Sequence, residues 1–260
     1  MANNLSPSTS IQKALDIINC FTVKEPSLFL EEIVKKVNIP KTTVFRTLVQ
    51  LEEYGYINKV TIEGKSSYSL GFAFLEKGQL VKSNLDIRKL AKSEMLGIRE
   101  KTNLTVQLAI RDHSEAVYIE QFESWRPIRI YPNIGRRAPL YAAACPRVLL
   151  AHMDAEEQAL LLKGYDFKKF TDATPINQTL ILSILDRIRK DGFSMSKGEL
   201  FEGTTALAVP IFNPITDEVI ASLSIIGMDK DFEHDYKKYI DMLQSAAKSI
   251  SKKINKDHKE

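Results

Sequence analysis

The chain has 260 residues and a nearly balanced charge, with 36 basic against 33 acidic side chains and a net charge of +3. Its content of 44% hydrophobic and 27% charged residues is typical of a soluble protein, and the length allows about two domains. No apolar run approaches the ~20 residues that span a bilayer, which argues against a membrane partner. Cys20 and Cys145 stand far apart and do not indicate a disulfide framework, so we expect a cytoplasmic protein.

Residues 1–10 are polar and carry no positive charge, so we expect a disordered N-terminus rather than a secretory signal. Residues 11–71 predict three helices and a hairpin. The first helix runs from Ile11 to Phe21, with Ser8 and Ser10 as candidate N-caps. Its expected apolar face consists of Ile11, Ala14, Leu15, Ile18 and Phe21.

Two further helices follow, separated by a break. Apolar side chains recur at helical spacing from Phe29 to Val37. Asn38-Ile39-Pro40 ends this helix, because proline disfavours helix in the residue before it. The next helix runs from Lys41 to Gly55. Its expected inward side chains are Val44, Leu48 and Leu51. Its other face carries mainly hydrogen-bond donors: Lys41, Thr42, Thr43, Arg46 and Gln50.

A hairpin is predicted directly after these helices. Tyr56 to Ile62 and Ser66 to Leu70 alternate as strands, and Glu63-Gly64 between them is a turn signal. Lys59 and Lys65 lie where such a wing reaches phosphates. A donor-bearing helix held against two others suits insertion into a DNA major groove. The predicted DNA-binding residues are Lys41, Thr42, Thr43, Phe45, Arg46, Gln50, Lys59 and Lys65.

Local charge supports this interpretation although the overall charge does not. Between Lys35 and Leu51 there are four basic residues and no acid. The alternative is an ordinary helical hairpin with a solvated basic face. Residues 72–84 predict a linker helix, and residues 85–260 a second domain.

The second domain mixes helices and strands without strict alternation, which predicts an α+β fold with a largely antiparallel sheet. The expected helices are Leu85 to Lys101, the later part of Tyr141 to Met153, Glu156 to Lys163, Ile176 to Lys190 ended by Gly192, and Phe232 to Ile254. The expected strands are Thr105 to Arg111, Ala116 to Phe122, a short one at Arg129 to Tyr131, Phe193 to Ser196, Ala206 to Phe212 and Val219 to Ile226.

Three blocks of sequence resemble the IclR-type family of bacterial transcriptional regulators. The first consists of Pro40 to Leu48, Leu51 to Tyr56 and Tyr68 to Gly71. The second consists of Gly135 to Ala144 and Leu149 to Ala151. The third consists of Gly192 to Ser194, Gly198-Glu199, Gly203, Ala208 to Ile211 and Ala221 to Gly227. Their common order and spacing make the resemblance specific.

The resemblance implies an N-terminal winged helix-turn-helix and a C-terminal GAF-like effector-binding domain. It also implies a homodimer or homotetramer, and small-molecule effectors that are often organic acids or aromatics. The effector pocket is expected between the sheet and residues 135–151. The chain departs from the family there: Cys145-Pro146-Arg147 replaces a small residue followed by Gly-Lys, and Ala206 replaces a common cysteine. Of two common serines, Ser224 remains and Ile226 replaces the other.

The chemistry of this pocket favours a ligand with an anionic end and an apolar body. If a helix begins within Ala142 to Pro146, its unpaired amides favour an anion. Arg136, Arg137 and Arg147 add charge, unless they are surface residues. The alternative is a pocket that has closed. The predicted effector-binding residues are Leu140, Ala142, Ala143, Ala144, Cys145, Arg147, Ala206, Ser224 and Ile226.

Enzymatic and metal sites are not indicated. His113, His152, His234 and His258 never fall in a metal-ligand spacing, and no nucleophile-elbow, Walker or dinucleotide motif occurs. Cys145 has two interpretations, a reactive thiol at a helix start or a small packing residue. We predict no enzymatic activity, no cofactor and no metal; an enzyme, or an assembly module without DNA binding, is the alternative class.

The sequence therefore predicts a DNA-binding transcriptional regulator. Its partners are expected to be double-stranded DNA with a near-palindromic operator and a small-molecule effector. Effector binding in the second domain is expected to shift the DNA-binding heads through the helix around Phe72 to Val81.

Overall fold

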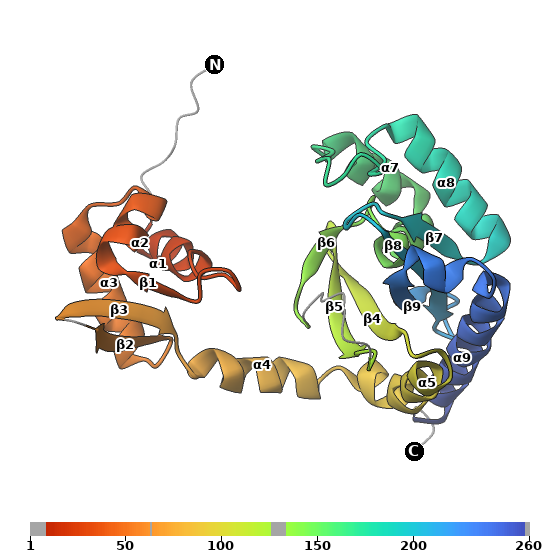
Figure 1. Ribbon diagram of the computed structural model, residues 1–260, viewed down its shortest axis with the longest axis horizontal. Coiled ribbons are helices and arrows are strands. Elements are labelled where there is room, and N and C mark those ends of the chain that lie inside the picture. Colours follow the sequence, from red (N-terminus) through yellow and green to blue (C-terminus); the bar gives the residue numbers. More distant parts are fainter. Residues whose placement is uncertain (1–8, 63, 126–133, 258–260) are drawn as a thin grey trace. The chain divides into compact units, whose positions relative to one another are not determined.

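The computed structural model divides into two compact units, Met1–Asn84 and Leu85–Glu260 (Figure 1). It describes residues 9–62, 64–125 and 134–257, with side chains up to residue 254. The expected disorder before residue 9, Glu63 of the predicted turn and the predicted strand from Arg129 to Tyr131 lie outside the described residues.

The first unit joins helices to a three-stranded antiparallel sheet of order β1-β3-β2. Its helices are α1 (Ser10–Asn19), α2 (Leu30–Val37), α3 (Lys41–Glu53) and α4 (Ala73–Ser83). Its strands are β1 (Ser27–Phe29), β2 (Ile57–Ile62) and β3 (Lys65–Leu70). Asn38 ends α2 in the left-handed conformation, with φ 53°, which separates α2 from α3 as the sequence predicts.

The inward face of α1 differs from the predicted one. Ile17 is fully buried in the core with Val44 and Leu48, whereas Ile11 and Leu15 are 74% and 53% exposed. Apolar residues of α1 form two overlapping helical stripes, and packing against α2 and α3 selects the stripe that contains Ile17. The predicted cap is also wrong. Thr9 caps α1 by accepting a hydrogen bond from the Gln12 amide, and Ser10 is the first helical residue.

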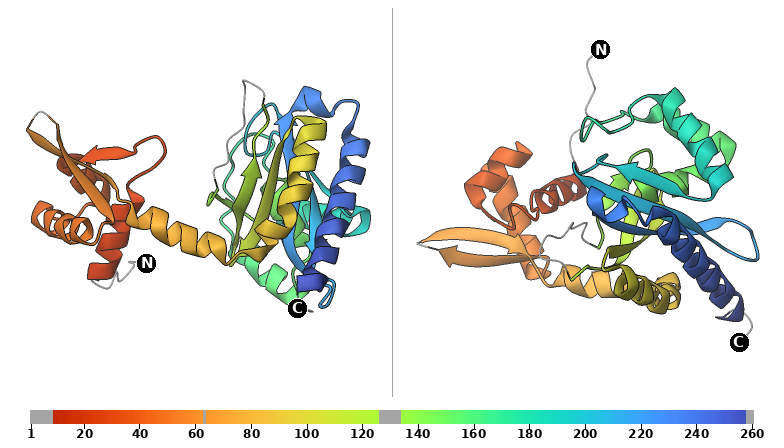
Figure 2. Two further views of the ribbon diagram at one scale, coloured as in Figure 1. Left: turned by 90° about the horizontal axis from the view of Figure 1, so that it is seen from below. Right: turned by 45° about the vertical axis from the view of Figure 1, so that its right-hand side comes forward.

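The second unit contains a six-stranded antiparallel sheet of order β6-β5-β4-β9-β8-β7, which confirms the predicted α+β class. The strands are β4 (Thr105–Asp112), β5 (Glu115–Phe122), β6 (Arg137–Pro139), β7 (Ser194–Lys197), β8 (Thr204–Phe212) and β9 (Val219–Met228). The helices are α5 (Asp86–Thr102), α6 (Ala144–Ala151), α7 (Ala155–Gly164), α8 (Gln178–Asp191) and α9 (Tyr236–Asp257). Figure 2 shows α5 and α9 side by side against the sheet.

The two faces of this sheet differ in side-chain size. Leu223 and Ile225 of β9 belong to the large apolar core under α5 and α9. Alternate residues of the same strand, Ser222 and Ser224, point to the other face, where Cys145 of α6 contacts both of them. Small and polar side chains under α6 leave room for a cavity on this face.

The start of the last helix and the strand β6 were not predicted. The last helix begins at Tyr236 rather than Phe232, which lies in a short 3-10 helix, Asp229–Phe232. There the Asp231 carboxylate accepts a hydrogen bond from the Met228 amide, 2.9 Å away, which favours a separate turn. β6 escaped prediction because it has only three residues and ends at Pro139, a residue confined to sheet edges.

No helix in the described ranges is long and apolar enough to cross a membrane.

Candidate nucleic-acid interface and ligand cavity

Helix α3 presents the predicted polar face to solvent. Val44 and Leu48 are fully buried, and Leu51 packs against the same core. The exposed residues of the helix include Lys41, Thr42, Phe45, Arg46 and Gln50. Thr43, by contrast, is half-buried and lies toward α1. The apolar stripe therefore fixes the roll of α3 and directs its donors outward.

The two cations on this face differ in their partners. Lys41 Nζ lies 2.8 Å from Glu31 Oε1, and the hydrogen bond from Lys41 lowers the pKa of the Glu31 carboxyl. Such an exposed ion pair contributes little to stability, so a phosphate can replace the carboxylate. Arg46 has no hydrogen bond or ion pair to any residue in the described ranges. It is free to donate to a base edge or a phosphate.

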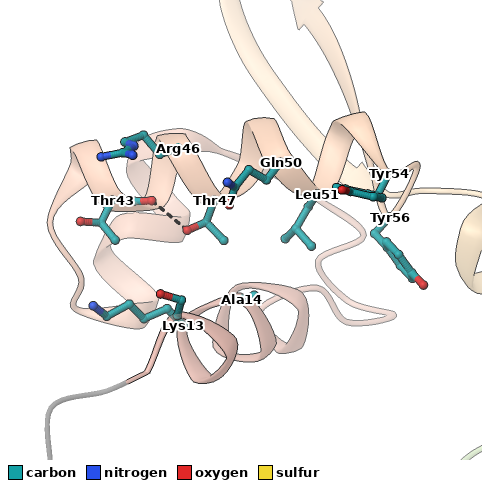
Figure 3. A pocket seen from close by; sticks show the side chains of 10 residues that line it. Lys13, Ala14, Thr43, Arg46, Thr47, Gln50, Leu51, Tyr54 and Tyr56 are labelled. Carbon is teal, nitrogen blue, oxygen red and sulfur yellow. Dashed lines mark hydrogen bonds between the residues drawn. The ribbon is translucent and has the colours of Figure 1, made fainter.

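A groove of about 450 Å³ separates α1 from α3 (Figure 3). Lys13 and Ala14 of α1 face Thr43 and Thr47 of α3 across it, and Arg46 lines the same groove. Sequence reasoning missed Lys13. The sequence feature that could have identified it is that Lys13 is the only basic residue of α1.

The wing carries its two predicted lysines on the surface. In the register of β2 and β3, Lys59 lies opposite Tyr68, and Lys65 lies opposite Ile62 beside the turn. Both lysine side chains are exposed. Gly64 takes the left-handed conformation with φ 78°, which the tight reversal requires.

The second unit contains a cavity between the sheet and the start of α6. The centre of a water molecule can move through only about 20 Å³ of it, which is room for about one or two waters. It is lined by Gln107, Tyr118, Arg136, Ala143, Ala144, Cys145, Ser196, Leu200, Phe201, Thr204, Ala206, Ser224 and Ile226.

Six of the nine predicted effector-binding residues line this cavity: Ala143, Ala144, Cys145, Ala206, Ser224 and Ile226. The other three, Leu140, Ala142 and Arg147, are buried elsewhere in the core. Sequence reasoning missed Gln107, Tyr118, Ser196, Leu200, Phe201 and Thr204. They come from separate strands and a loop, and only the register of the sheet brings them together.

The start of α6 is held by a buried carboxylate. Ala143, the N-cap, has φ 71° and ψ 168°, a conformation that strains any residue with a Cβ. Its amide donates to Glu199 Oε2 at 3.0 Å. Glu199 also pairs with Arg147, which donates to the Met195 carbonyl at 2.8 Å. Arg147 is therefore occupied within the fold.

The first-turn amides of α6 remain available beside the cavity. Among the described residues, none accepts a hydrogen bond from the Ala144 or Cys145 amide. Pro146, the third residue of the helix, has no amide hydrogen to satisfy. Unpaired N–H groups at a helix N-terminus favour an anion.

Cys145 behaves as a packing residue in this structure. Its Sγ lies 3.3 Å from Ser224 Oγ and 3.5 Å from the Ser222 carbonyl oxygen. Burial raises the pKa of the Cys145 thiol to about 11. The thiolate, which is the nucleophilic form, is therefore scarce at neutral pH. Within the described ranges, no group of three or more His, Cys, Asp or Glu side chains could hold a metal ion.

A helix-turn-helix unit with an exposed donor face, followed by an α+β unit, defines the class of DNA-binding transcriptional regulators. Residues 10–60 match the IclR helix-turn-helix domain, and residues 79–252 match the C-terminal domain of the bacterial transcriptional regulator IclR. The chain belongs to the IclR family of bacterial transcriptional regulators, as the three sequence blocks predict.

Individual relatives agree with this assignment over nearly the whole chain. The chain is 37% identical to the transcriptional regulator KipR of Bacillus subtilis, over 94% of this chain and 96% of that protein. The crystal structure of IclR from Thermotoga maritima matches with a TM-score of 0.75 and 28% identity, over 94% of this chain and 98% of that one. An IclR homologue from Microbacterium hydrocarbonoxydans, complexed with 4-hydroxybenzoate, matches with a TM-score of 0.81 at 20% identity, over 95% of this chain and 99% of that one.

Proposed function

We propose that the protein binds a near-palindromic operator as a homodimer or homotetramer, and that a small organic acid in the second unit modulates this binding. The observation that carries the first half is the unpaired Arg46 on the exposed face of α3. A two-fold assembly presents two such faces and so favours two related half-sites. In this proposal residues 11–71 form the DNA-binding domain, residues 72–84 the linker and residues 85–260 the effector domain.

Direct contacts to the operator are assigned to the predicted face. Arg46, Gln50 and Thr42 read or clamp DNA from α3, with Lys41, Thr43 and Phe45 beside them. Lys59 and Lys65 of the wing contribute phosphate contacts. A DNA partner supports a cytoplasmic location, and regulation of this kind requires no enzymatic activity.

The effector site is assigned to the cavity beside α6. Available amides at the helix start favour an anion, and the small side chains of Ala206 and Ala144 border an apolar space. The homologue complexed with 4-hydroxybenzoate carries a ligand of this chemical type. Effector binding is proposed to alter the DNA-binding heads through α4.

Selection of genomic fragments on the immobilised full chain, followed by footprinting, tests the DNA half. We expect enrichment of a few fragments that contain an inverted repeat. Repeating the footprint with a panel of small acids tests the regulatory half. Equal retention of all fragments, with and without acids, would refute the proposal.

A further inference from the structure

The structure separates three arginines that the sequence leaves equivalent. Arg147 is almost fully buried and pairs with Glu199. Arg137 lies at the surface and pairs with Asp112 and Glu115. Arg136 alone of the three lines the cavity. Among the described residues, none forms an ion pair with it.

The guanidinium of Arg136 is partly desolvated without a compensating charge. Burial lowers its pKa, and the nearby Tyr118 acts in the opposite direction. A guanidinium nevertheless stays protonated in proteins. Within the described ranges it contacts the ring of Phe201, with the guanidinium carbon 4.8 Å from the ring centroid. A cation–π contact offsets part of the desolvation cost and does not use the N–H donors, for which no described residue is an acceptor.

Two further donors converge on the same cavity. Tyr118 is 4% exposed and Ser196 is 5% exposed. Neither side-chain hydroxyl makes a hydrogen bond to a residue in the described part of the chain. Together with Arg136 and the amides of Ala144 and Cys145, they form a donor-rich site that calls for an acceptor-rich ligand.

The cavity has to enlarge before it holds such a ligand. The loop from Gly198 to Gly203 forms the wall that could move. This loop has left-handed glycines at both ends, with φ 65° and 71°. Its first part is anchored, because the Thr174 hydroxyl donates to the Glu199 carbonyl at 2.7 Å and the Glu199 carboxylate holds α6. The tip at Phe201 is held by one hydrogen bond from Thr204 to its carbonyl and by Arg136.

We propose that Arg136 recognises the carboxylate of the effector and that it exchanges partners when the effector binds. In the empty state its guanidinium lies over Phe201 and keeps the loop tip closed. In the bound state the carboxylate takes the guanidinium donors, with Tyr118 or Ser196 donating to a second oxygen, and the loop tip moves outward. This inference rests on the proposed function of the cavity as the effector site.

Isothermal titration of the full chain with matched probes tests the recognition step. The probes are pyruvate and 4-hydroxybenzoate, each against its neutral amide. We expect the acids to bind wild type more tightly than their amides. Arg136→Gln should weaken acid binding by about tenfold to a hundredfold, the loss of a hydrogen bond to a charged group. It should not weaken amide binding, because an amide lacks the charge that Arg136 recognises and the substitution also removes the Arg136–Phe201 contact that closes the loop tip. Arg136→Lys should retain part of the preference for acids.

The surface variant Arg137→Gln is the matched control, because it also removes one guanidinium and should keep wild-type affinity. Equal weakening of acids and amides in Arg136→Gln would show a merely structural role and overturn the proposal. A wild-type protein that binds neither acid, or prefers the amides, would also overturn it. Fragment retention measured on the same sample shows separately whether the DNA-binding proposal stands.

A second variant tests the exchange of partners. Phe201→Leu keeps an apolar side chain and removes the ring face that holds Arg136. We expect acid affinity to rise about threefold to tenfold, because the closed state loses its cation–π contact. Hydrogen exchange of residues 200–202 in the ligand-free protein should accelerate in the same variant. Unchanged affinity and unchanged exchange would overturn the proposal that the Arg136–Phe201 contact keeps the loop tip closed.

Discussion

The exposed polar face of α3, which we call the recognition face, and the cavity of the second unit differ in how their arginine side chains are solvated. Arg46 on α3 is an exposed cation that water solvates, and in the proposed function DNA replaces this water. Arg136 beside the cavity is a partly desolvated cation that depends on an aromatic ring. The exposed face can therefore be rigid and always ready, whereas the buried site needs a ligand or a moving wall to satisfy its donors.

The largest expected effect is on the folded scaffold of the cavity. Glu199→Ala leaves Arg147 buried without its partner and frees the Ala143 amide. Removing one member of a buried ion pair costs about 3–5 kcal/mol. We expect a corresponding loss in the free energy of unfolding, measured by urea denaturation. Glu202→Ala, at an exposed position of the same loop, is the control. A loss below ~1 kcal/mol would show that the pair is dispensable.

On the recognition face the expected effect falls on binding and not on folding. Arg46→Ala should weaken operator binding by roughly 1–3 kcal/mol and leave the unfolding midpoint unchanged. Fluorescence anisotropy with the selected operator measures the affinity. Lys163→Ala removes an exposed charge from the second unit and should have no effect. Equal affinity of Arg46→Ala and wild type would contradict the assigned face.

The sequence predicted the structure of some regions better than that of others, and the reason lies in how clearly apolar and polar residues are separated along each element. The buried face of α3 was predictable, because charged and apolar residues occupy separate stripes along the helix. The roll of α1 was not, because its apolar stripes overlap and tertiary packing chose Ile17 over Ile11 and Leu15. The family blocks located α6, where Ala143 and Cys145 line the cavity; their role in effector binding stays a prediction.

Part of the opposite wall of the cavity was beyond sequence reasoning, although Ala206, Ser224 and Ile226 of that wall were among the predicted residues. Tyr118, Ser196 and Phe201 lie on two strands and a loop that meet only through strand register. No local pattern encodes which alternate residues of a strand face a given helix in another part of the chain. The partner of Arg147 was equally hidden, because Glu199 lies 52 residues away.

A smaller effect tests whether strain is stored where the cavity meets α6. Ala143 adopts φ 71° and ψ 168°, a region that only glycine visits readily. Relief of this strain should outweigh the added freedom of the unfolded chain. We expect Ala143→Gly to raise the free energy of unfolding by about 1 kcal/mol. Ala142→Gly is the control and should destabilise the protein, because Ala142 is buried and its backbone is not in the left-handed region. Destabilisation by both substitutions would rule out stored strain.

The smallest expected effect distinguishes the two lysines of the wing. Each phosphate contact contributes about one to the slope of log affinity against log salt. Lys65 lines the same surface hollow as Glu31 and Glu32, so these acids offset part of its charge, whereas Lys59 has no ion pair among the described residues. Lys59→Ala should therefore reduce the slope by about one, and Lys65→Ala by less. Anisotropy titrations on the operator across a salt series measure both slopes. Because phosphates carry no sequence information, both variants should lose affinity equally for operator and random duplex; a loss confined to the operator would mean that the wing reads bases.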